Sequence, residues 1–175
     1  MDYFTEPRKS YIETINNWYR LLEKNAVKDI ITDSLRFLSE SGKIDVYGFV
    51  VMPNHIHLIW KINEMNGKES SHGSFLKYTA HMFKKYLKAN DSGFLNKFAV
   101  EAENKKYEFW QRDSLAFELT KRDTAFQKLN YIHNNPLAER WQLCDDRVKY
   151  YYSSAKFYET GVDDFGFLKH IMDVF

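Results

Sequence analysis

Cysteine is almost absent from this sequence, in which Cys144 is the single example among 175 residues. One cysteine excludes an intramolecular disulfide and a zinc finger built on several thiolates. Proline and glycine are also scarce, at three and seven residues, which leaves little room for a flexible linker. A hydrophobic share of 44% indicates a folded chain. We therefore expect one domain over residues 1–175, with residues 137–175 as a C-terminal extension packed on it.

The sequence also lacks any run of about 20 apolar residues, the length that crosses a membrane. The residues after Met1 lack the basic and apolar segments of a signal peptide. We therefore expect a cytoplasmic protein with no membrane partner. The formal net charge of +1 neither requires nor excludes nucleic acid, so a DNA-binding surface would need basic residues gathered locally.

Two histidines stand in the stretch 50–60, which reads Val-Val-Met-Pro-Asn-His-Ile-His-Leu-Ile-Trp. The pattern predicts a strand over 44–51, a tight turn over 52–54 and a second strand over 55–62. Successive side chains on a strand point to opposite faces, so His55 and His57 should share one face. Imidazole is a common metal ligand, but two ligands make an incomplete site. The opposite face of this strand should carry the apolar residues Ile56, Leu58 and Trp60.

Hydrophobic periodicity predicts the remaining elements. We expect a strand over 10–15, helices over 26–39 and 74–88, and extended segments over 107–112 and 115–119. A further helix should begin at Asp123 or Thr124 and end before Pro136, because the residue before a proline is unfavourable in a helix. We also expect a loop over 63–73, Ser74 as the cap of the next helix, an irregular segment over 90–106 and a short helix over 165–172.

Basic residues recur at helical spacing on the helix expected over 74–88. A stripe of lysines can follow a phosphate backbone and supply affinity that is independent of sequence. An ordinary solvated helix face has the same pattern, so both interpretations stay open. The candidate nucleic-acid-binding residues are Lys77, Lys84, Lys85, Lys88 and, from the Trp-Gln-Arg sequence at 110–112, Arg112.

A second polar group lies in the sequence Tyr-Ile-His-Asn-Asn-Pro at 131–136. Tyr131 and Asn135 are four residues apart, so a helix would place both on one face. If that face meets the histidine strand, two imidazoles, an amide oxygen and a phenol share one neighbourhood. Asn135 could then be a third metal ligand, and a divalent ion could polarise a phosphate beside Tyr131. A tyrosine on a helix is otherwise more often a packing residue.

The sequence resembles the HUH-type single-tyrosine transposases of insertion sequences, most closely the REP-associated ones. The resemblance extends from the first strand to about Ser154. It implies a ferredoxin-like α/β (α+β) fold with a mainly antiparallel sheet flanked by helices. It also implies a metal-dependent endonuclease and strand transferase that acts on single-stranded DNA with hairpin ends. The motifs that carry it, in order, are Met-Pro-Asn-His-Ile-His-Leu at 52–58, Trp-Gln-Arg at 110–112 and Tyr-Ile-His-Asn-Asn-Pro at 131–136.

Carried over by position, the resemblance implies that His55, His57 and Asn135 bind Mg²⁺ or Mn²⁺. Tyr131 would be the nucleophile that forms a 5′-phosphotyrosine linkage, while His133 should point elsewhere on the helix. A transposase of this kind would act at the bacterial nucleoid, and we expect a homodimer.

The sequence departs from the family at Ala116 and Phe117, where many relatives have an Asp-His pair. A role of that strand in DNA contact or proton handling is therefore not carried over. Two other functions stay open. One is a domesticated, non-catalytic regulator that binds hairpin DNA or RNA. The other, which is weaker, is a different histidine-dependent phosphoesterase. A histidine-triad hydrolase would need a third alternating histidine at the position of Ile59. Two-histidine phosphoesterases have two separated His-X-Thr/Ser motifs, which this sequence lacks.

Overall fold

The computed structural model describes residues 7–175, which are built around a four-stranded antiparallel sheet with the strand order β2-β3-β1-β6. One helix joins the first two strands, and a second helix follows the third strand. This β-α-β-β-α-β order in an antiparallel sheet is the ferredoxin-like arrangement that the sequence predicts. The elements are β1 (Lys9–Thr14), α1 (Asn25–Glu40), β2 (Ile44–Val51), β3 (His55–Ile62), α2 (Ser71–Asn90) and β6 (Leu115–Glu118).

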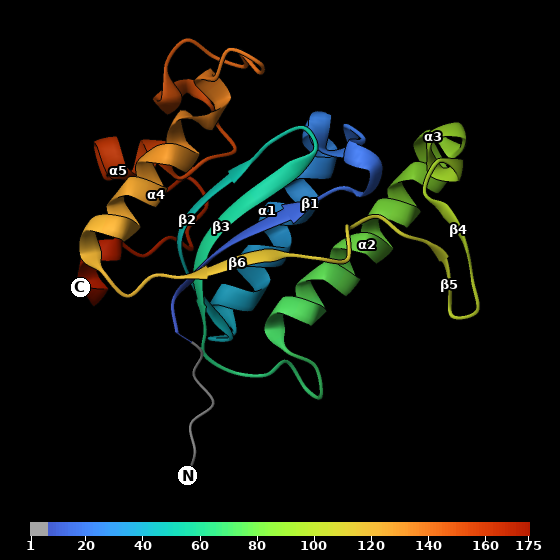
Figure 1. The fold of residues 1–175 in the computed structure, drawn as a ribbon, viewed down its shortest axis with the longest axis horizontal. Coiled ribbons are helices and arrows are strands. Elements are labelled where there is room, and N and C mark those ends of the chain that lie inside the picture. The colour runs from blue at the N-terminus through green and yellow to red at the C-terminus, as the bar shows by residue number, and fades with distance from the viewer. Residues whose placement is uncertain (1–6) are drawn as a thin grey trace.

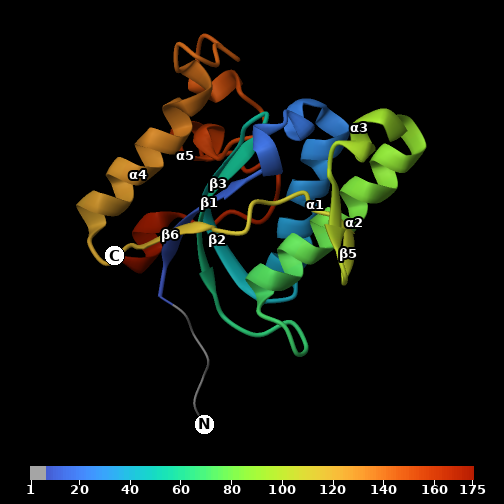
Figure 2. The same ribbon diagram turned by 45° about the vertical axis from the view of Figure 1, so that its right-hand side comes forward.

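The sheet lies between two layers of helices (Figures 1 and 2). Helices α1 and α2 cover one face, and α4 (Arg122–Asn134) packs on the other. Ile56, Leu58 and Trp60 lie in the core beneath α1 and α2, whereas Ile59 lies in a second core with Leu129 of α4. The predicted alternation of β3 is therefore confirmed, and the histidines belong to the α4 side. None of the helices in residues 7–175 is long and apolar enough to cross a membrane.

The turn between β2 and β3 is held by backbone hydrogen bonds to its neighbours. The Met52 amide donates to the His55 carbonyl at 2.8 Å, which closes the hairpin. The amides of Ile15 and Leu22 donate to the carbonyls of Asn54 and Pro53, both at 2.9 Å. The start of the histidine strand is thus fixed to the segment between β1 and α1.

The structure corrects the expected boundaries of α2 and of the segment after it. The helix begins at Ser71, not after residue 74, and Ser70 is its cap, because the Ser70 hydroxyl accepts a hydrogen bond from the Gly73 amide at 3.0 Å. Ser74 lies within the first turn and accepts a hydrogen bond from Asn66. The segment 90–106 is not irregular. It contains α3 (Ser92–Asn96), which is capped by Asp91, and the hairpin of β4 (Ala99–Ala102) with β5 (Lys105–Tyr107).

The helix expected over 165–172 is wrong. Instead, α5 (Ala155–Thr160) ends at Gly161, whose φ of 75° suits a residue without a side chain, and a 3-10 turn covers Ile171–Val174. The intervening chain runs beside β2, where the Lys169 amide donates to the Val46 carbonyl at 2.9 Å. The Asp163 carboxylate holds this conformation by accepting from the Phe165 and Leu168 amides. The division into one domain with an extension over 137–175 stays a prediction.

Candidate metal and nucleophile site

The two imidazoles of β3 face each other closely. Their Nε2 atoms are 3.1 Å apart, and both residues are at least 95% buried. The Asn54 side chain sets the orientation of the first ring, because His55 Nδ1 donates to its Oδ1 at 2.7 Å. With the proton on Nδ1, the Nε2 atom of His55 carries a free lone pair.

A third polar group reaches this pair from the end of α4. The side-chain amide of Asn135 lies 2.9 Å from His57 Nε2 and is buried. Asn135 follows the last residue of α4 and begins a 3-10 turn with Pro136, so the helix ends where the sequence predicts. An amide presents either its nitrogen or its oxygen after a half-turn about its last bond. Asn135 can therefore offer an oxygen to the point where the two Nε2 atoms converge.

Tyr131 lies one helical turn before Asn135. Its ring centre is 5.7 Å from that of His57, and the two planes meet at 86°. The residue is 53% exposed, so Tyr131 lies at the surface of the protein beside the buried imidazoles. The structure thus brings together, within one chain, the four residues that the sequence places in one site.

Burial keeps both imidazoles neutral. It lowers the pKa of His55 to about 4, helped by the positive charge of Arg140. It lowers the pKa of His57 to about 3, with further effects from His55, Lys128 and Arg140. Neutral imidazole is the form that binds metals, because protonation occupies the lone pair.

The geometry of the three groups fits a divalent ion. Neighbouring ligands of an octahedral ion with bonds of about 2.1 Å are about 3 Å apart, close to the observed Nε2 separation of 3.1 Å. Within residues 7–175 no three histidine, cysteine or acidic side chains form such a cluster, so the set depends on the Asn135 amide. Three ligands leave positions open for phosphate oxygens. One feature is unusual for a metal ligand: the buried Nδ1 of His57 has no hydrogen-bond partner within the described chain.

His133 points away from this site, as its helical position predicts. It is buried, and its Nε2 lies 2.7 Å from the Ser154 hydroxyl. The same hydroxyl accepts a hydrogen bond from the Phe49 amide on β2. Burial and the charge of Arg147 lower the pKa of His133 to about 3. His133 therefore ties α4 to the sheet through Ser154.

Close packing at Gly48 also sets the position of α4. A Cβ placed on Gly48 would lie 2.6 Å from a methyl group of Leu129 and 3.4 Å from one of Ile132. Both are buried residues of α4. A side chain at residue 48 would therefore require the Leu129 side chain, or the helix with it, to shift. The helix that carries Tyr131 thus packs its apolar side chains against the strand at a glycine.

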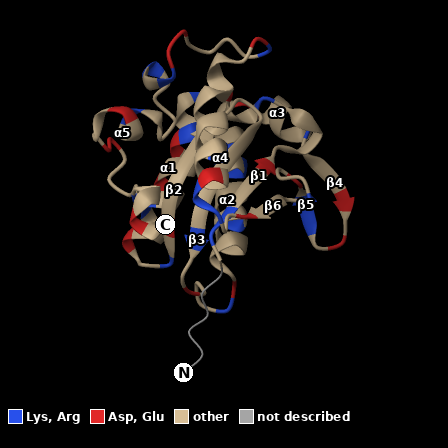
Figure 3. Ribbon diagram, turned by 60° about the vertical axis from the view of Figure 1, so that its left-hand side comes forward, with Lys and Arg blue, Asp and Glu red and all other residues tan. Residues whose placement is uncertain are grey.

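The predicted DNA-binding lysines lie elsewhere, on α2 behind the sheet. Lys77 pairs with Glu69 at 2.6 Å, and Arg112 pairs with Glu108 at 3.0 Å. Lys84 lies over the Tyr107 ring, beside a cleft of about 510 Å³ between α2 and the β4–β5 hairpin. Basic and acidic residues are interspersed along the ribbon in Figure 3, and the basic pair Lys105–Lys106 is on β5. The structure does not bring these residues to the histidines.

Sequence reasoning missed the cations that do lie beside the site. Lys128 has its Nζ 5.5 Å from the Tyr131 ring centre, and Arg140 lies over Trp141, whose ring is 5.8 Å from that of His55. Lys128 is three residues before Tyr131, so helical spacing could have found it. Arg140 and Trp141 lie beyond the helix, where no periodic pattern points to them.

No family model and no curated protein sequence matches this chain significantly. Among solved structures, it is similar to a REP-associated tyrosine transposase bound to a REP hairpin, with a TM-score of 0.61 and 14% identity over 98% of this chain and 90% of that one. A candidate transposase from Deinococcus radiodurans R1 has a TM-score of 0.40 and 14% identity over 74% of this chain and 91% of that one, too low a score to support an argument. The chain therefore has the fold of a tyrosine transposase, as the sequence motifs indicate.

Proposed function

We propose that this protein is a transposase-type enzyme that cleaves single-stranded DNA and rejoins it to another strand through a covalent 5′-phosphotyrosine. The observation that carries the proposal is the convergence of His55, His57 and Asn135 beside an exposed Tyr131. The fold shared with a hairpin-bound tyrosine transposase supports it, and we infer that hairpin DNA is also the partner here. We also propose that the enzyme acts on DNA in the cytoplasm, at the bacterial nucleoid.

His55, His57 and Asn135 would hold the divalent ion, which would polarise the scissile phosphate and stabilise the charge that develops on it. Two imidazoles shift the intrinsic preference from Mg²⁺ toward Mn²⁺, because magnesium prefers oxygen ligands. Asn54 keeps His55 in the form whose Nε2 accepts the ion.

Tyr131 would supply the nucleophile. Its phenolic oxygen forms a bond to phosphorus and loses its proton to solvent, while the 3′ oxygen of the upstream strand leaves and takes up a proton. The 5′-phosphate stays on Tyr131 as an ester. The 3′ hydroxyl of a second strand can then attack that phosphorus and release the phenol, which joins two strands without ATP because the number of ester bonds is unchanged. The exposure of Tyr131 gives both strands access.

The test is to mix the protein with hairpin DNA that carries a single-stranded flank, in the presence of Mn²⁺ or Mg²⁺. We expect an adduct that survives denaturing electrophoresis and is absent with Tyr131→Phe. Tyr78→Phe is the matched control, since Tyr78 is a 50% exposed tyrosine on α2. An undiminished adduct with Tyr131→Phe would refute the nucleophile. Salt-sensitive binding with no adduct under any metal would favour the non-catalytic regulator instead.

A further inference from the structure

Rings and cations form an unbroken series of contacts across the site. On one side, Lys128 Nζ lies 5.1 Å from the Phe117 ring centre and 5.5 Å from that of Tyr131. On the other, the Trp141 ring lies 5.8 Å from His55, and the guanidinium of Arg140 lies 5.6 Å from the Trp141 ring centre. The imidazole pair stands in the middle of this series.

Phe117 and Leu115 are exposed apolar side chains on the outermost strand. They are 52% and 56% exposed. Leu115 pairs with Ile12, which pairs in turn with His57, so these residues form one row across the sheet. Phe117 lies two residues along β6 from Leu115 and therefore on the same face as His57. A half-exposed aromatic ring thus lies on the face of the sheet that bears the site.

Two of the cations that contact these rings, Lys128 and Arg140, have no acidic partner among the described residues, whereas Arg20, which lies 5.7 Å from the Trp141 ring centre, pairs with Glu23. Within the described chain, neither Lys128 nor Arg140 forms an ion pair, in contrast to Lys77 with Glu69 and Arg112 with Glu108. The charges of Lys128 and Arg140 act on His57, whose pKa they help to lower. Cations that are free of carboxylates beside the proposed scissile phosphate can bind phosphates.

We propose that a single strand of DNA crosses the site between Phe117 and Trp141, with bases stacked on both rings and flanking phosphates held by Lys128 and Arg140. Single-stranded nucleic acid is the ligand that fits, because every base has a face that can stack on a ring and every phosphodiester carries a negative charge. Proteins that bind single-stranded nucleic acid combine aromatic and basic side chains in the same way. This proposal rests on the proposed function, because the proposed function is what places the scissile phosphate beside Tyr131. It differs from the sequence prediction, which placed DNA contacts on the lysines of α2.

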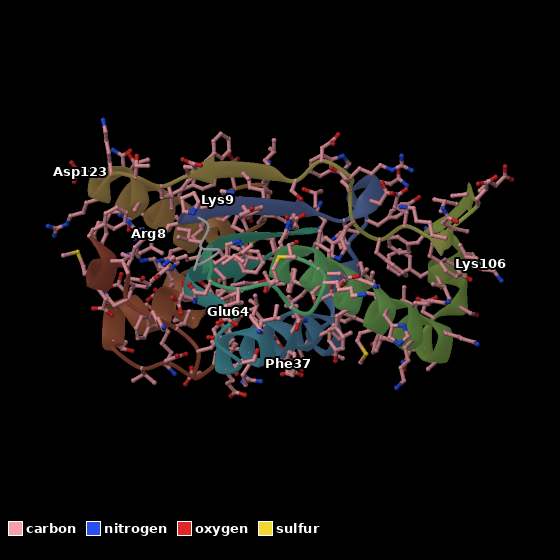
Figure 4. All side chains as sticks on the ribbon, turned by 90° about the horizontal axis from the view of Figure 1, so that it is seen from below. Arg8, Lys9, Phe37, Glu64, Lys106 and Asp123 are labelled. Atoms are coloured by element: carbon pink, nitrogen blue, oxygen red, sulfur yellow. The ribbon has the colours of Figure 1, made fainter. Side chains whose placement is uncertain are left out.

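The experiment compares two fluorescein-labelled strands by anisotropy in EDTA, where no cleavage occurs. One is a short oligothymidine, and the other is an abasic strand with the same number of phosphates. We expect Phe117→Ala and Trp141→Leu each to weaken oligothymidine binding by about tenfold, with little change on the abasic strand. Lys128→Gln should weaken binding of both. The matched control is Phe37→Ala, since Phe37 is a 64% exposed aromatic on α1, on the far side of the molecule from Asp123 of α4 (Figure 4).

Trp141 is half-buried, so its variants need a check on folding. Trp141→Phe keeps an aromatic face and should retain most of the affinity for oligothymidine that Trp141→Leu loses. The two variants are compared once their melting temperatures are shown to be equal. Ring variants that bind oligothymidine like the wild type, or that lose equal affinity on both strands, would overturn the proposal. The covalent adduct is measured separately. Its absence, with base-dependent binding intact, would refute the transposase and leave the DNA path standing.

Discussion

The side-chain amide of Asn135 lies 2.9 Å from Nε2 of His57, although 78 residues separate the two in sequence. The contact joins the end of α4 to the middle of the sheet and places Tyr131, one helical turn earlier, over the same imidazole. A shift of α4 by one residue would rotate the helix by about 100° and remove both groups from the site.

Asn135→Ala should weaken binding of Mn²⁺ by at least about tenfold, because a ligand oxygen is lost. Asn135→Asp keeps an oxygen at the same position and should bind at least as tightly as the wild type. Both are measured by isothermal titration calorimetry. Asn134→Ala, at the exposed neighbouring residue, is the control and should bind normally. Equal affinity of Asn135→Ala and Asn134→Ala would exclude the amide as a ligand.

Tyr131 should act together with the histidines of its own chain, because its ring centre is 5.7 Å from that of His57 within one subunit. We expect His57→Ala and Tyr131→Phe to be inactive separately and to stay inactive when mixed, as judged by adduct formation. Restored activity in the mixture would show that the tyrosine acts on a partner subunit. The homodimer itself stays a prediction, to be measured by light scattering with and without hairpin DNA.

Gly48→Ala should displace α4, because the added methyl group would lie 2.6 Å from Leu129. Overpacking of this kind costs about 1–3 kcal/mol of the free energy of unfolding, measured by urea denaturation. The rate of adduct formation should fall as well, because Tyr131 moves with the helix. Gly93→Ala in α3 is the control, since its nearest contact would be an ordinary 3.7 Å. Unchanged stability and rate in Gly48→Ala would show that the glycine does not set the docking of α4.

His133 should make stability fall in acid. Its pKa is about 3 when folded and about 6.5 when unfolded, so between these values the unfolded chain binds more protons. Stability contributed by the neutral, buried ring is therefore full above pH 6.5 and is lost as the pH falls below it, by up to about 1.4 kcal/mol per pH unit. In EDTA, His133→Gln should reduce the number of protons taken up on unfolding between pH 3 and 6.5 by about one relative to the wild type. Identical pH dependence of stability in His133→Gln and the wild type would contradict the assignment.

The residues that reveal the site in the sequence are those whose spacing follows from regular structure. Alternation on a strand placed His55 and His57 on one face, and helical spacing placed Tyr131 with Asn135. The cap at Ser70 and the chain over 165–170 differ from the prediction because hydrogen bonds from backbone amides to side chains decide both. The Ser70 hydroxyl accepts from the Gly73 amide, and the Asp163 carboxylate accepts from the amides of Phe165 and Leu168. Such bonds depend on local geometry that no periodic pattern encodes.

The cations beside the site were missed for a related reason. The lysines of α2 form a conspicuous stripe in the sequence, but the sheet separates them from the imidazoles. Arg140 and Trp141 reach the site through the turn that follows Pro136, and a turn sets the direction of the chain without a periodic signal. Which cations lie beside the histidines therefore depends on tertiary packing, not on their number in one segment.

Two imidazoles and one carboxamide are proposed to surround a single cation beside the phenol of Tyr131. The most direct measurement is anomalous scattering from crystals grown with Mn²⁺. One peak about 2.1–2.3 Å from both imidazole Nε2 atoms and from Oδ1 of Asn135 is the predicted result. A site that stays empty at saturating Mn²⁺, or manganese bound without either imidazole, would show that these residues are not the ligands of the ion.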